Sequence, residues 1–221
     1  MLTKKFISIA LLLFIWIPII VFSALLIHNS LLYYTFDQEY GILPEKTIAM
    51  KDPVWRVSFY IHVIAGVVCL SVPVFSFLGK YIGLRIRVHQ RIGQVYVWVC
   101  MLVVAPTGMY LALYAKGGFM AQFGFLVQGI LLSLFTYKGY KAIQKKDTPA
   151  HIQWMIRSYA IATAVLSFRI YHIIFFFTTI PYEDIYGLSQ WLSLTGNALV
   201  AEFAILYFFR STKIVPHLNK N

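Results

Sequence analysis

The sequence predicts an all-α integral membrane protein, a bundle of six transmembrane helices, and three observations support that prediction. Apolar residues make up 60% of the chain and charged residues 12%, whereas soluble domains average roughly 45–50% and about 25%. The apolar residues form six long runs, each near the ~20 residues that a helix needs to cross a bilayer. The net charge of +11 is divided among short clusters between these runs, which argues against a nucleic-acid-binding surface.

The predicted spans form one transmembrane domain that covers residues 1–221, because no linker is long enough to separate soluble domains. Lipid accepts a long apolar segment as a helix, since all its backbone groups are then paired within the segment. The spans are expected at about residues 6–27, 54–78, 92–115, 119–143, 150–177 and 188–209.

Turn and capping residues support several of these boundaries. Asp52-Pro53 and Thr148-Pro149 each place a capping residue and a first-turn proline before a span. Gly117-Gly118 predicts a tight turn between the third and fourth spans. Prolines inside three spans predict kinks, at Pro18, Pro73 and Pro106.

The distribution of Lys and Arg predicts the orientation of the bundle. Of the 19 basic residues, 14 fall in segments assigned to the cytoplasm and five lie on the outer side, namely Lys46, Lys51, Arg56, Lys116 and the inward-lying Arg169. Because basic residues concentrate on the cytoplasmic side, both termini are expected there, in a bacterial plasma membrane. Lys4-Lys5 and the first apolar run are interpreted as an uncleaved signal anchor. Membrane lipid is then the general partner, and the oligomeric state stays open.

Ionisable and polar residues inside the spans are the candidate functional residues, because they are costly in lipid. His62 and His172 lie roughly 12 Å and 8 Å below the outer ends of their spans, so they share an outer layer. His89 and His151 lie at the inner boundary. The remaining intramembrane polar residues are Arg157, Arg169, Asn197 and Glu202.

Two imidazoles from facing helices are the ligands that haem b iron takes in a helix bundle. His62 with His172 would hold an outer haem, and His89 with His151 an inner one. Arginines would bind the propionates: Arg56 and Arg169 outside, and Arg87, Arg91 and Arg157 inside. This hypothesis describes a membrane oxidoreductase of the b-type cytochrome kind, which moves electrons from a quinol or another redox partner.

Other hypotheses stay open. The histidines, Arg169, Asn197 and Glu202 could line the cavity of a small-molecule-binding protein or a proton-coupled transporter. Glu202 and Arg157 lie at similar depth, so an ion pair is the alternative to a proton-carrying carboxylate. Asp147, His151 and His89 could form a small metal site. A non-catalytic assembly or sensory protein is the third class. Whether the protein is an enzyme is therefore undecided from the residues.

Two segments resemble an uncharacterised family of predicted bacterial multi-pass membrane proteins, a domain of unknown function. They are Arg85-Ile86-Arg87-Val88-His89-Gln90-Arg91-Ile92-Gly93 and His151-Ile152-Gln153-Trp154-Met155-Ile156-Arg157-Ser158-Tyr159-Ala160, and the resemblance extends over roughly residues 54–210. It implies a multi-span membrane protein. A weaker likeness, to the cytochrome b561 and ferric-reductase group, implies two haems held by paired histidines, although here one helix carries both His151 and His172.

Overall fold

The computed structural model describes residues 17, 20–78, 83 and 85–212, and its regular elements are all helical in that part of the chain. Four of its helical stretches are long and apolar enough to cross a bilayer: Pro53–Ser76, Ile86–Ala112, Gly118–Gln144 and Thr148–Phe176. These coincide with the second to fifth predicted spans. The all-helical membrane class is therefore confirmed, and four of the predicted spans contain a helix that is long and apolar enough to cross a bilayer.

The first and sixth predicted spans are not among those four. Most of the first span lies outside the described residues, and its described end continues into a short apolar helix, Ile20–Thr35. The sixth falls inside helix α8 (Tyr182–Thr212), which is 31 residues long and carries Asn197 and Glu202. Six spans and cytoplasmic termini therefore stay predictions, and Lys4-Lys5 and Pro18 lie outside the described residues.

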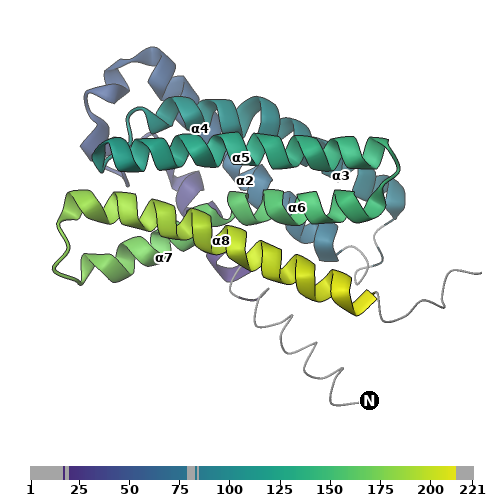
Figure 1. Cartoon of the computed structure of the whole chain (residues 1–221). Helices are drawn as coiled ribbons and strands as arrows, with labels where there is room; N and C mark the ends of the chain where they lie inside the picture. The colour runs from purple at the N-terminus through teal and green to yellow at the C-terminus, as the bar shows by residue number, and fades with distance from the viewer. Residues whose placement is uncertain (1–16, 18–19, 79–82, 84, 213–221) are drawn as a thin grey trace, which may run out of the picture.

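The helices form an elongated bundle (Figure 1). Helices α5 (Gly118–Gln144) and α6 (Thr148–Ala162) run side by side as a hairpin, and α7 (Ala164–Phe176) packs along α8. Helix α2 (Pro53–Leu78) contacts both α3 (Ile86–Val99) and α4 (Ala105–Ala112). The main core draws on α2, α3, α5, α6, α8 and the segment that begins at Cys100, and its buried residues include Cys69, Tyr96, Cys100, Leu132, Ile161 and Leu194.

The third span contains an irregular turn. A π-helical segment, Cys100–Val104, separates α3 from α4, and Pro106 follows it within the first turn of α4. Because proline has no N–H and its ring crowds the preceding turn, the backbone departs from α-helical geometry just before it. The irregularity predicted at Pro106 is confirmed, whereas α2 continues as one helix through Pro73.

The predicted fifth span is not one continuous helix. Thr163 interrupts it between α6 and α7, which the apolar pattern did not reveal. The Ala160 carbonyl at the break accepts a hydrogen bond from Asn197 Nδ2 at 2.9 Å and one from Thr163 Oγ1 at 3.1 Å. Side-chain donors thus replace backbone partners in the core.

The capping and turn residues lie where the sequence predicts them, except at the start of α6. Asp52 caps α2, where its Oδ1 accepts from Val54 N at 2.9 Å, and Gly117 and Gly118 both have positive φ in the turn before α5. The cap of α6 is Asp147 rather than Thr148, since Asp147 Oδ1 accepts from Ala150 N at 3.0 Å. The proline therefore occupies the second helical position.

Residues 33–51, here called the outer segment, contain short 3₁₀ turns at one end of the bundle. This end is named the outer end and the opposite one the inner end, after the orientation that the sequence predicts. Leu43 and Ala49 are buried against Trp55 and Phe59 of α2. The Lys46 ammonium donates to the Tyr114 carbonyl, and Lys116 pairs with Glu45 at 2.7 Å. These contacts hold the outer segment over the ends of α2 and α4.

Candidate functional site

The structure places His89 and His151 together at the inner end of the bundle. Helices α3 and α6 bring the two imidazoles within electrostatic range of one another. His151 Nδ1 lies 2.9 Å from the Gly139 carbonyl oxygen of α5. Because a carbonyl only accepts, Nδ1 carries the proton and Nε2 is the free acceptor nitrogen. We call His89 and His151 the inner pair.

Arg87 and Arg91 lie on the same helix as His89, and both are exposed. In the described part of the chain neither makes an ion pair. Arg157, in contrast, is held by Glu202 at 2.5 Å and 2.8 Å. Of the three inner arginines assigned to propionates, two therefore remain available for an anionic ligand.

His62 and His172 have no contact residue in common. His62 Nδ1 lies 2.9 Å from Thr107 Oγ1 on α4, and its ring fills the space beside Gly108, where an added Cβ would lie 2.9 Å from His62 Cε1. The His172 ring lies 4.5 Å from the Tyr186 ring on α8. The two histidines therefore pack against different helices.

A second group of polar residues lies at the outer end, and we call it the outer cluster: Arg169, His172, Tyr33, Tyr40, Tyr182 and Tyr186. Three separate parts of the chain contribute to it, namely the outer segment, α7 and α8. Arg169 lies within electrostatic range of Tyr33, Tyr40 and Tyr186. Tyr33 and Tyr40 themselves meet edge to face, with ring centroids 4.9 Å apart.

One member of the outer cluster has a buried nitrogen without a partner, and a second is an exposed arginine that pairs with no described residue. His172 Nδ1 is buried and has no hydrogen-bond partner, although Arg169 and Glu45 lie within electrostatic range. Arg169 itself makes no hydrogen bond or ion pair to any described residue. The tyrosines were not foreseen, because aromatic residues at a membrane interface are ordinarily an aromatic belt.

Two of the residues assigned to a transport cavity, Glu202 and Asn197, make hydrogen bonds to neighbouring helices. Glu202 accepts two hydrogen bonds from Arg157, and that guanidinium also lies 4.7 Å from the Trp154 ring centroid. Asn197 accepts from Ser167 Oγ at 2.7 Å and donates to the helix break. The ion-pair interpretation of Glu202 is confirmed.

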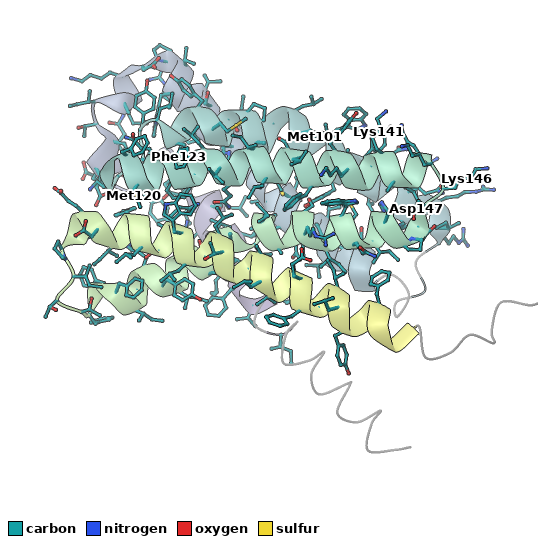
Figure 2. The ribbon with its side chains drawn as sticks, in the orientation of Figure 1. Met101, Met120, Phe123, Lys141, Lys146 and Asp147 are labelled. Carbon is teal, nitrogen blue, oxygen red and sulfur yellow. The ribbon has the colours of Figure 1, made fainter. Side chains whose placement is uncertain are left out.

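The proposed small metal site at the inner end does not assemble. Among the described residues, no group of three or more His, Cys, Asp and Glu side chains could hold a metal ion, and the Asp147 carboxylate caps α6. Figure 2 shows Asp147 with Lys141 and Lys146 at this end, opposite Met120 and Phe123. The remaining predicted residue, Arg56, is exposed at the outer end and lines a hollow apart from the outer cluster.

Sequence reasoning also missed a buried hydrogen-bonded chain in the core. Ser158 Oγ lies 2.7 Å from both Tyr96 Oη and Thr136 Oγ1, which joins α3, α5 and α6. Small polar residues are common between membrane helices, so no signal in the sequence distinguished these three. Nearby, Gln190 Nε2 donates to Gln128 Oε1 at 2.8 Å.

The bundle of apolar helices, with its polar residues paired between helices, defines a multi-pass integral membrane protein. A family model described as a predicted membrane protein (DUF2306) matches residues 59–205, and the chain belongs to that family. The match includes all four candidate histidines. No curated protein matches the chain, and no solved structure matches it.

Proposed function

We propose that this protein binds a small molecule at the outer cluster. The observation that carries the proposal is the unpartnered, buried His172 Nδ1 beside an Arg169 that makes no ion pair or hydrogen bond to any described residue. A buried polar group without a partner costs about 1–3 kcal/mol, and an arginine on a membrane-spanning helix is costly as well. A ligand that supplies acceptor oxygens to both side chains offsets these costs.

The surrounding side chains indicate the class of ligand. Tyrosine rings provide flat apolar walls and a hydroxyl that donates or accepts, and the guanidinium of Arg169 favours a carboxylate or another oxygen with negative charge. The site therefore suits a planar or aromatic body that carries an anionic or carbonyl oxygen. A quinone is such a compound dissolved in lipid, and an aromatic acid is one dissolved in water.

Binding to the purified full-length protein in nanodiscs tests this proposal. We expect a short-chain quinone or benzoate to bind, and Arg169→Gln to weaken that binding by tenfold or more. His172→Phe keeps the ring contacts and should also weaken it. Lys145→Gln serves as the matched control, because Lys145 is an exposed cation that follows α5 and does not belong to the outer cluster. Failure of both compounds to bind, or unchanged binding by Arg169→Gln, would reject the proposal.

A second candidate function has its own observation. The two segments that carry the family resemblance meet at the inner pair, where His151 Nε2 is free and Nδ1 is fixed by a carbonyl, as is usual for a metal-ligating histidine. We propose that the inner pair holds a single haem b, with Arg87 and Arg91 toward its propionates. Haem would supply the one-electron chemistry of a membrane oxidoreductase, while the chain orients the imidazole.

The absorption spectrum of protein purified from haem-replete cells tests this second candidate. We expect a Soret band that shifts on reduction and is lost in both His89→Ala and His151→Ala. His28→Gln, on an exposed residue outside both sites, should leave the band unchanged. A colourless wild-type preparation would exclude haem at the inner pair and leave the outer cluster untouched.

A further inference from the structure

A hollow of about 800 Å³ opens at the outer end of the bundle, and we call it the outer hollow. One wall is the first two turns of α2, with Arg56, Val57, Tyr60 and Ile61, and the other is the outer segment, with Phe36 and Lys51. None of its lining residues belongs to the outer cluster. It is therefore a separate feature from the site proposed above.

The lining of the outer hollow is divided between charge and apolar surface. Val57 and Ile61 lie four residues apart on one face of α2 and are 56% and 43% exposed, so this face points away from the bundle. Phe36, on the opposite wall, is 65% exposed. Such a surface on a membrane-spanning helix faces lipid rather than water.

The charged part lies nearer the end of the helix. Arg56 and Lys51 are both exposed, and within the described residues neither forms an ion pair. Glu39 is the acidic residue in the lining, so the hollow carries a net charge of about +1. This charge favours an anionic occupant over a zwitterionic one.

The depths of the two parts match the two parts of a phospholipid. Helix α2 begins at Pro53, which places Arg56 within its first turn and Ile61 roughly 12 Å along the axis. A phosphate at the level of Lys51 and Arg56 would therefore continue into an acyl chain beside Val57 and Ile61. The predicted orientation also favours a ligand at Lys51 and Arg56. They are two of the five basic residues predicted on the outer side, and the positive-inside tendency does not account for basic residues there.

We propose that the outer hollow binds an anionic phospholipid, with its phosphate at Lys51 and Arg56 and one acyl chain along Val57 and Ile61. Charge attracts the headgroup, and the exposed apolar face of α2 offers van der Waals contacts along the chain. Because free phosphate or a glycerol phosphate offers the same headgroup chemistry without the chain, the test separates these sources from a lipid.

Lipid retention by the full-length protein provides the test. The protein is delipidated in detergent, equilibrated with mixed micelles of phosphatidylglycerol and phosphatidylcholine, and analysed by native mass spectrometry. We expect the wild type to retain phosphatidylglycerol, and the Lys51→Gln, Arg56→Gln double variant to retain at least fivefold less. Lys145→Gln is the matched control. Equal retention of the two lipids, or unchanged retention by the double variant, would overturn the proposal.

A measurement on the wild type makes the test independent of variant folding. Phosphatidylglycerol with a photoreactive acyl chain should label the α2 peptide that contains Val57 and Ile61, and excess unlabelled phosphatidylglycerol should suppress the labelling. Suppression by inorganic phosphate or glycerol 3-phosphate to the same extent would show that only the headgroup is recognised. Labelling spread evenly over all the spans would show an unspecific lipid annulus, and either result would contradict the proposal.

Discussion

Arg157 of α6 and Glu202 of α8 form a two-point ion pair, in which Nε donates to Oε1 at 2.5 Å and Nη2 to Oε2 at 2.8 Å. The planar guanidinium matches the carboxylate geometry and also lies over Trp154. Because both carboxylate oxygens are engaged, Glu202 is held in its charged form. The pair joins two helices.

We therefore expect Arg157 and Glu202 to contribute to stability as a unit. Glu202→Gln and Arg157→Gln should each lower the free energy of unfolding in detergent, and a double-mutant cycle should give a coupling of about 1 kcal/mol. The coupling is modest because half of the Glu202 side chain, 49%, is exposed. Additive effects of the two substitutions would contradict a direct interaction.

Cys69 and Cys100 should be convertible to a disulfide. Their Sγ atoms lie 3.1 Å apart between α2 and the π-helical turn, and both side chains are buried. A membrane-permeable two-electron oxidant would take two electrons and two protons from the thiols as the S–S bond forms. When the oxidised protein is then denatured, we expect neither cysteine to react with an alkylating reagent. Reduction with dithiothreitol should restore the reactivity of both. Cys69→Ser should leave Cys100 reactive throughout.

The turn between α4 and α5 provides a matched pair of glycines. Both have positive φ, 84° at Gly117 and 62° at Gly118. An added Cβ at Gly117 would lie 2.5 Å from Tyr186 Cβ and 3.0 Å from the Glu183 carbonyl oxygen, whereas nothing lies within 4 Å of one at Gly118. Gly118→Ala should cost about 1 kcal/mol of unfolding free energy for its backbone alone. Gly117→Ala should cost a further 1–3 kcal/mol or so, and equal losses would refute the packing argument.

The cap of α2 should make stability depend on acidic pH. Hydrogen bonds from Tyr110 Oη, at 2.9 Å, and Val54 N hold the pKa of the Asp52 carboxyl below its usual value. A carboxyl whose pKa is lowered by folding stabilises the protein above its unfolded pKa, and that contribution is lost as the pH falls through the folded pKa. Thermal midpoints in detergent from pH 6 to pH 3 should thus fall more for the wild type than for Asp52→Asn. Parallel curves would exclude this contribution.

Several features of the fold were predictable because they depend on local sequence. Apolar runs of sufficient length specify helices in lipid, and the second to fifth spans appear where hydropathy placed them. The same holds for the Asp52 cap and the Gly117-Gly118 turn, since each is formed by neighbouring residues. Family membership was also predictable from the two segments around His89 and His151.

The candidate sites depend on contacts between residues far apart in sequence, which the depth of a residue in its helix does not specify. Depth placed His62 beside His172, but helix rotation turned His62 toward Thr107 and His172 toward Tyr186. Thr163 interrupts the fifth span, and the outer segment packs so that Tyr33 and Tyr40 lie within electrostatic range of Arg169. Hydropathy records which residues lie in lipid, whereas rotation and helix contacts follow from side-chain packing across the whole bundle.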